Sequence, residues 1–159
     1  MKRRCSAFLL ALVSLFLVLN LAGCGGDQFS TTIITTTSGS REAAIPEDGA
    51  YTSKEDVALY LHTYGHLPDN FITKKEAQAL GWEGGSLEPY APGMCIGGSS
   101  FGNFEGLLPE ADGRSYQECD IDTLGADSRG AKRLVYSNDG LIYYTDDHYE
   151  SFTLLYGEE

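Results

Sequence analysis

The order of the local structure signals limits the fold of this chain most strongly, because two helix patterns come before every strand pattern. The first helix pattern begins after Ser53 and ends at Gly65. The second begins with the capping box Thr73-Lys74-Lys75-Glu76 and ends at Gly81. Alternating or β-branched runs follow at residues 95–101, 115–122, 133–137, 141–145 and 149–156. This order predicts an α+β fold, in which the helices cover one face of an antiparallel sheet of about five strands.

The N-terminal segment has the pattern of an export signal. Basic residues 2–4 precede an apolar run, Ala7–Leu21, which is too short to span a bilayer comfortably. The run closes on Leu21-Ala22-Gly23-Cys24, which resembles the bacterial lipobox, where the cysteine is lipidated and becomes the new N-terminus. An ordinary cleaved secretion signal is the alternative. We expect residues 1–23 to be a signal peptide and the protein to be exported, either anchored to the outer face of the membrane through Cys24 or secreted.

The rest of the chain divides into a tether and one domain. Residues 24–50 are rich in Thr, Ser and Gly and are expected to form a flexible tether after the lipidated cysteine. Residues 51–159 are expected to form the single folded domain, because 42% hydrophobic residues in a chain of 159 are enough for one core.

The charge balance is strongly acidic. The chain has 11 Lys and Arg against 23 Asp and Glu, a net charge of −12. This balance argues against a protein that holds nucleic acid or an anionic membrane by bulk charge, since like charges repel. Any contact with a polyanion would have to depend on a local group of cations.

Polar residues that suit phosphodiester chemistry gather on the predicted sheet. Strand alternation places Glu118 on the face opposite Cys119, away from the helices, where a partly buried carboxylate can act as a general base. Arg129 and Arg133 flank the next strand, and His148 is expected at the start of the last one. A base, two cationic clamps and an acid are the groups that transesterification of a phosphodiester needs. Each also has a structural alternative: a solvated strand residue, salt-bridge partners and a structural histidine.

The residues also carry a resemblance to a known family. The segments Tyr60–Tyr64, Leu67–Lys74 and Glu76–Trp82 look like the helical region of barnase. Shorter matches follow at Ala91-Pro92-Gly93, Ile96-Gly97-Gly98, Glu105-Gly106, Leu141-Ile142-Tyr143 and Asp147-His148-Tyr149. The chain therefore resembles the barnase and binase family of secreted guanyl-preferring ribonucleases over nearly all of residues 56–155, and that family's fold agrees with the α+β prediction.

The resemblance implies a catalytic role for each residue that matches the family's motif. Glu118 would be the general base for the ribose 2′-hydroxyl, and His148 the general acid for the leaving 5′-oxygen. Three cations, Lys74, Arg129 and Arg133, would stabilise the phosphoryl transition state, and Tyr149 would help to hold the phosphate. The substrate would be single-stranded RNA, cleaved through a 2′,3′-cyclic phosphate, with neither metal nor cofactor required.

The resemblance also implies a guanine-binding loop, formed by Gly102, Asn103, Phe104 and Glu105. Glu105 would accept hydrogen bonds from the N1–H and the exocyclic amine of guanine, while backbone amides of the loop meet O6. At Phe104 the family pattern has an arginine, at Leu107 a lysine and at Ser99 an aspartate. Phe104 can stack on a base instead.

The departures at Phe104 and Leu107 affect the expected partners. With two cations lost, we expect weak binding of long RNA, and weak or absent inhibition by barstar, the acidic inhibitor of barnase. A cognate barstar-like inhibitor stays open, and a monomer is expected. The alternative to an enzyme is a catalytically silent, surface-anchored binding module on the same fold. Retention of the catalytic residues together with Glu105 favours the enzyme.

Other polar and sulfur-containing residues have structural interpretations. The resemblance assigns Arg114 and Asp139 to an ion pair, and Asp120 is expected to orient the arginines. Cys95 and Cys119 fall on the first two predicted strands, in a protein whose exported compartment permits oxidation. They form either a cross-strand disulfide or two buried free thiols, and the sequence leaves both open.

Overall fold

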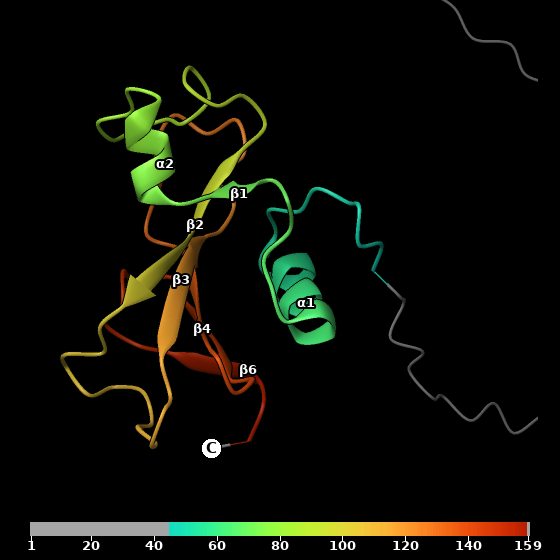
Figure 1. Cartoon of the computed structure of the whole chain (residues 1–159). Coiled ribbons are helices and arrows are strands. Elements are labelled where there is room, and N and C mark those ends of the chain that lie inside the picture. Colours follow the sequence, from blue (N-terminus) through green and yellow to red (C-terminus); the bar gives the residue numbers. More distant parts are fainter. Residues whose placement is uncertain (1–44, 159) are drawn as a thin grey trace, which may run out of the picture. The chain divides into compact units, whose positions relative to one another are not determined.

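The computed structural model describes residues 45–158, which form two helices and one six-stranded sheet (Figure 1). The strands follow one another across the sheet in chain order, β1 to β6. The helices are α1 (Lys54–Tyr64) and α2 (Lys74–Ala79), and the strands are β1 (Phe71–Ile72), β2 (Cys95–Phe101), β3 (Tyr116–Asp120), β4 (Arg133–Ser137), β5 (Ile142–Thr145) and β6 (Thr153–Tyr156). The predicted α+β class is confirmed. Within the described part, no helix is long and apolar enough to cross a membrane.

Both helices begin where their capping residues predict. The hydroxyl of Ser53 accepts a hydrogen bond from the amide of Asp56 at 3.1 Å, which satisfies one of the free amides at the start of α1. Gly65 ends this helix in the left-handed conformation, with φ 75°, a conformation that glycine adopts without steric strain. At α2, the capping box between Thr73 and Glu76 is complete in both directions.

The sheet contains one strand that the sequence patterns did not reveal. β1 pairs in parallel with β2, through Phe71 with Cys95 and Ile72 with Ile96, whereas every other pairing is antiparallel. Two residues are too few to show the alternation by which strands are recognised. This pairing ties the segment between the helices to the edge of the sheet.

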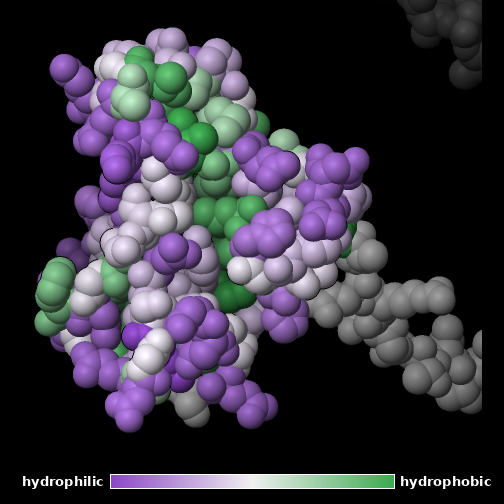
Figure 2. Space-filling model, in the orientation of Figure 1, coloured by the Kyte–Doolittle hydropathy of each residue, from purple (hydrophilic) through white to green (hydrophobic). Residues whose placement is uncertain are grey.

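Helix α1 covers one face of the sheet. Its residues Val57, Ala58 and Leu61 pack against a buried cluster from three strands or their ends: Cys119, Ile121, Leu134, Tyr136 and Ile142. Figure 2 shows hydrophobic residues gathered in the hollow between α1 and the sheet. Leu134, fully buried in this cluster, and Cys119 mark the α1 face of their strands. Glu118 and Val135 therefore face the other side.

Helix α2 packs elsewhere than α1, so the expectation that both helices share one face holds for α1 only. Gly97 points toward the α1 cluster, because a Cβ there would lie 2.7 Å from Leu67 and Phe71 side-chain atoms. Its neighbour Ile96 faces the opposite way and joins Ala77 of α2 in a second cluster with Trp82, Leu87 and Ala91. This arrangement brings the start of α2 to the face that carries Glu118.

The segment directly before Tyr51, the predicted start of the domain, is hydrogen-bonded to three tyrosines. Ile45 is buried, and its carbonyl accepts a hydrogen bond from the Tyr64 hydroxyl at 2.6 Å. The hydroxyl of Tyr51 donates to the carbonyl of Pro46, and the hydroxyl of Tyr60 donates to the carbonyl of Glu47, at 2.9 Å each. Composition alone could not show this contact, since it depends on tyrosines that fold onto the segment from α1 and its start. The predicted signal peptide, Cys24 and most of the tether lie outside the described residues.

Candidate active site

Glu118 lies in the middle of β3 with 6% of its surface exposed. Its two neighbours across the sheet are Ser99 of β2 and Val135 of β4. Both of its carboxylate oxygens are hydrogen-bonded: the Lys74 ammonium group donates to Oε1, and the Tyr149 hydroxyl donates to Oε2. The first residue of α2 and the loop after β5 thus meet at one carboxylate.

The environment of Glu118 keeps it ionised. Burial pushes the pKa of this carboxyl upward, but the hydrogen bonds from Lys74 and Tyr149 and the charges of Lys74 and Arg129 outweigh burial. The net effect lowers the pKa below its ordinary value. Glu118 is therefore a carboxylate at neutral pH, which is the form that accepts a proton.

A second buried carboxylate, Asp120, holds the two arginines. Its side chain is 1% exposed and accepts two hydrogen bonds from Arg129, at 2.6 and 2.7 Å. The Nε of Arg133 lies 2.9 Å from Asp120 Oδ1, and the two residues are direct neighbours across β3 and β4. The expectation that Asp120 orients the arginines is confirmed. The guanidinium of Arg129 also lies 5.7 Å from the Trp82 ring centre, a contact that the sequence did not reveal.

Arg133 is almost completely enclosed, with 2% of its surface exposed. Its terminal nitrogens donate to the backbone carbonyls of Arg129, Gly130 and Lys132, at 2.7 to 3.1 Å. It therefore also anchors the loop that carries Arg129. Burial and the neighbouring Glu118 carboxylate raise the pKa of the Tyr149 hydroxyl, and the positive charge of Arg133 opposes them only in part.

His148 does not begin a strand, and this prediction is wrong. The last strand starts at Thr153, so His148 is an exposed residue of the loop between β5 and β6. His148 and Tyr149 both have left-handed backbones, with φ 63° and 77°. Such conformations are strained for these residue types and cluster at functional sites. The centre of the His148 ring lies 5.1 Å from that of the Tyr149 ring, and the Tyr149 hydroxyl in turn donates to Glu118.

Asp147 shapes this loop. Its Oδ1 accepts hydrogen bonds from the Thr145 hydroxyl and from the amides of Glu150 and Ser151, at 2.8 to 3.0 Å, and its Oδ2 accepts one from the Ser151 hydroxyl. The bonds from Ser151, together with those from Thr145 and Glu150, lower the pKa of Asp147 to about 2. The sequence analysis missed this role, although an Asp with Ser four residues later is a turn signal that could have revealed it.

The predicted guanine-binding loop follows β2 directly. The centre of the Phe101 ring, at the end of β2, lies 5.3 Å from that of the Tyr149 ring, which places this loop beside the contacts of Glu118. The Asn103 side chain closes the loop with two hydrogen bonds to the Leu108 backbone. Its Nδ2 donates to the carbonyl at 2.9 Å, and its Oδ1 accepts from the amide at 3.0 Å. Phe104 is 94% exposed, and Glu105 is exposed as well. The loop therefore presents one aromatic ring and one carboxylate to solvent.

Two further pairs lie away from Glu118, one of ions and one of cysteines. Arg114 and Asp139 form the expected ion pair, with Nε and Oδ2 2.8 Å apart. Cys95 and Cys119 are buried free thiols, so the disulfide that the sequence left open is not formed. Gly97, not Cys95, lies opposite Cys119, which leaves the two cysteines diagonal to each other across the strands. In residues 45–158, no group of three or more His, Cys, Asp or Glu could hold a metal ion.

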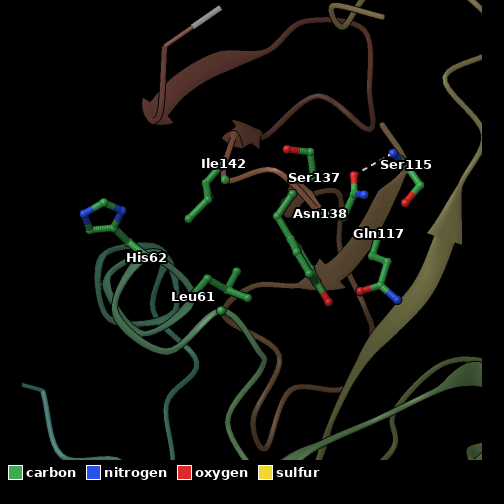
Figure 3. Close-up of a pocket in the computed structure, with 10 residues that line it drawn as sticks. Leu61, His62, Ser115, Gln117, Ser137, Asn138 and Ile142 are labelled. Carbon is green, nitrogen blue, oxygen red and sulfur yellow. Dashed lines mark hydrogen bonds between the residues drawn. The ribbon is translucent and has the colours of Figure 1, made fainter. Parts of the chain in front are cut away.

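A pocket of about 420 Å³ lies on the opposite face of the sheet (Figure 3). Its walls include Leu61 and His62 of α1, Gln117 of β3 and Ile142 of β5. The Asn138 side chain in its wall is held by the Ser115 amide at 2.8 Å, drawn as a dashed line in Figure 3. Because Gln117 and Glu118 are consecutive strand residues, the sheet separates this pocket from the face that carries Glu118.

Comparisons with known proteins identify a family. A family model described as ribonuclease matches residues 54–156. The ribonuclease of Bacillus intermedius is 54% identical over 101 residues, which cover 62% of this chain and 62% of that protein. The ribonuclease of Heyndrickxia coagulans is 53% identical over 100 residues, covering 62% of this chain and 91% of that protein. Guanyl-specific ribonuclease St of Saccharopolyspora erythraea is 46% identical over 57 residues, 36% of this chain and 56% of that protein.

The match to Bacillus intermedius ribonuclease thus spans about three fifths of that relative's length. The family model, in contrast, covers well over half of this chain and includes all five residues predicted to be catalytic. The chain belongs to the ribonuclease family.

Proposed function

We propose that this protein is an endoribonuclease that cleaves single-stranded RNA on the 3′ side of guanosine. The observation that carries the proposal is the arrangement at Glu118: a buried, ionised carboxylate that contacts Lys74 and Tyr149, with the arginines of Asp120 beside it. A proton acceptor surrounded by cationic and hydroxyl donors suits a reaction in which charge develops on a phosphoryl group.

The reaction takes place in two steps. Glu118 takes the proton of the ribose 2′-hydroxyl, the 2′-oxygen forms a bond to phosphorus, and the bond from phosphorus to the 5′-oxygen breaks. Protonated His148 gives its proton to that leaving oxygen. In the second step a water molecule opens the 2′,3′-cyclic phosphate, with His148 as the base and Glu118 as the acid. Lys74, Arg129 and Arg133 stabilise the charged phosphoryl group, so the mechanism needs no metal ion.

Guanine preference rests on the exposed loop after β2. Glu105 is free to accept two hydrogen bonds from the N1–H and the amine of guanine, an arrangement of donors that adenine, cytosine and uracil do not offer. Relatives named guanyl-specific ribonuclease, such as St of Saccharopolyspora erythraea and Sa3 of Kitasatospora aureofaciens, support this assignment. A catalytically silent binding module would leave the same fold without turnover.

The activity is tested with a fragment of residues 45–159 and with the dinucleotides GpN and ApN in the presence of EDTA. We expect a cyclic phosphate product from GpN, little from ApN, and a loss of about 10²–10⁴-fold in His148→Ala, because the leaving oxygen loses its proton donor. Equal turnover by His148→Ala, or no product from the wild type, would contradict the proposal. An effect of EDTA would contradict the metal-independent mechanism alone.

We also propose that the mature protein is anchored to the outer face of the cell membrane through Cys24. The support is the sequence Leu21-Ala22-Gly23-Cys24 directly after an apolar export signal. Cys24→Ala is expected to move the protein from the membrane fraction to the medium, measured by immunoblotting of both fractions. Membrane retention of this variant equal to that of the wild type would refute the anchor.

A further inference from the structure

The pocket of Figure 3 has a floor made of one row of strand residues. Gln117 of β3, Tyr136 of β4 and Ile142 of β5 are direct neighbours across the strands, so their side chains share the α1 face. The last turn of α1 adds Leu61 and His62 to the wall. Figure 3 shows Leu61 and Ile142 on one side of the pocket and Gln117 on the other. The pocket therefore has an apolar side and a polar side.

Two glycines keep this pocket open. Gly65 ends α1, Gly140 lies in the turn before β5, and both line the pocket. A Cβ atom at either position would have no atom of a distant residue within 4 Å. Their φ angles of 75° and 100° favour glycine, because a side chain would be strained there. The space of about 420 Å³ is thus left free by the backbone itself, and its size suits a small-molecule site.

The Tyr136 side chain brings an unpaired hydroxyl to this pocket. Only 8% of the residue is exposed, yet no hydrogen bond joins its hydroxyl to another residue of the described part. The hydroxyl is not among the fully enclosed polar atoms that lack a partner, so it opens into the pocket that Tyr136 lines. The neighbouring polar side chains are bonded within the protein. Ser137 Oγ accepts from the Leu141 amide at 2.9 Å, and Asn138 is held as described above.

The chemistry of this pocket is uncharged. Burial raises the pKa of Tyr136, so its hydroxyl stays neutral and can both donate and accept a hydrogen bond. In the described part, no Asp, Glu, Lys or Arg lines the pocket, and His62 at the exposed rim is the one other ionisable group. A charged ligand would lose its hydration there without an opposite charge in return. A ligand that bonds to the Tyr136 hydroxyl would instead satisfy a buried polar group.

We propose that this pocket binds a small uncharged aromatic molecule with a hydroxyl or amino group, its ring against Leu61 and Ile142 and its polar group hydrogen-bonded to the Tyr136 hydroxyl. Leu61 and Ile142 supply apolar contact, and the rings of Tyr136 and His62 favour an aromatic ligand over an aliphatic one. The inference goes beyond the proposed ribonuclease function. Because the sheet separates the pocket from Glu118, binding here and RNA cleavage are measured separately.

The test uses three probes with the same ring: phenol, toluene and benzoate. Each is titrated into the ¹⁵N-labelled protein, and ¹H–¹⁵N NMR follows the backbone amides of Gly65 and Gly140. Phenol should shift both signals to saturation. Toluene should bind about 3–10-fold more weakly, because it forms no hydrogen bond. Benzoate, which is charged at neutral pH, should give no saturable shift. Phenol shifts confined to other residues, or benzoate binding as tight as that of phenol, would overturn the inference.

The variant Tyr136→Phe keeps the ring and removes the hydroxyl. Its affinity for phenol should fall about 3–10-fold, to that of toluene, whereas its affinity for toluene should not change. The matched control is Tyr64→Phe, which loses a hydroxyl bonded to the Ile45 carbonyl outside the pocket. This control should bind both probes as the wild type does. An unchanged affinity of Tyr136→Phe for phenol would contradict the assigned hydrogen bond.

Urea unfolding tests the unpaired hydroxyl without any ligand and shows that the variant is folded. Tyr136→Phe should unfold at the same urea concentration as the wild type or at a higher one, because no hydrogen bond within the protein is lost. Tyr60→Phe should unfold at a lower concentration, because the Tyr60 hydroxyl donates to the Glu47 carbonyl. A midpoint of Tyr136→Phe as low as that of Tyr60→Phe would overturn the inference. A protein that binds phenol but cleaves no RNA would refute the proposed function alone.

Discussion

Glu118→Gln is expected to lower kcat/KM for GpN cleavage by about 10²–10⁴-fold, which is the usual contribution of a positioned general base. Glutamine keeps the shape of the side chain and one oxygen to accept from Lys74 or Tyr149, but it cannot take a proton. The measurement is the initial rate of cyclic phosphate formation. Gln117→Ala is the matched control, because Gln117 is the preceding residue of β3, lies on the opposite face and is exposed. Activity of Glu118→Gln within tenfold of the wild type would exclude Glu118 as the base.

The same substitution should also change the pH dependence of stability. Because the pKa of Glu118 is lowered in the folded protein, its ionised form stabilises the fold fully above the pKa of the unfolded chain, about 4.3. This stabilisation is lost as the pH falls through the folded-state pKa. In Glu118→Gln the free energy of unfolding should therefore fall less steeply with acidification than in the wild type. Urea titrations at a series of pH values measure the difference.

Asp120→Asn is expected to lower the free energy of unfolding by about 3–5 kcal/mol, the range found when one partner of a buried ion pair is removed. Arg133 is 2% exposed and Arg129 is partly buried, so both positive charges would remain in the protein without their shared carboxylate. A domain of this size is stable by only about 5–15 kcal/mol, so the loss would be a large part of the total. Urea unfolding followed by circular dichroism gives the value.

The control for this prediction is Asp122→Asn, two residues further along the chain. Asp122 pairs with Lys132 at 2.6 Å, but both side chains are about half exposed, so the expected loss is about 0–1 kcal/mol. The backbone of Asp122 has φ 59°, which asparagine also tolerates well. If both variants lost the same free energy of unfolding, the buried Asp120 carboxylate would stabilise the fold no more than the exposed Asp122 carboxylate.

Most cations of this acidic domain are paired with carboxylates. Of the seven Lys and Arg residues in the described part, six take part in ion pairs: Lys54, Lys74, Arg114, Arg129, Lys132 and Arg133. The three cations proposed to act on the phosphoryl group are among them, paired with Glu118 and Asp120. The acidic excess therefore does not prevent a local cationic site, because the two buried carboxylates gather the cations at one place.

The sequence alone was sufficient where the signal is local. Ser53, Gly65 and the Thr73 capping box marked the helix ends, because capping hydrogen bonds join residues only a few positions apart. The residue bounds of β2 and β4 agree with the strand patterns, because alternation over several residues reflects one buried face. The candidate catalytic residues came from their chemistry and from a family resemblance that spans nearly the whole domain.

Contacts between distant parts of the chain were decided only by the tertiary structure. The parallel pairing of β1, the placement of α2 beside Ile96 and the packing of Ile45 against α1 each depend on a partner far away in sequence. The left-handed loop at His148 depends on the hydrogen bonds of Asp147, which replaced the strand that alternation had predicted. The sequence thus indicated both helices and most of the strands, and it named the candidate catalytic residues. The contacts of Lys74 and Tyr149 with Glu118 required the tertiary fold. These donors come from α2 and from the loop after β5, which lie far from β3 in the chain.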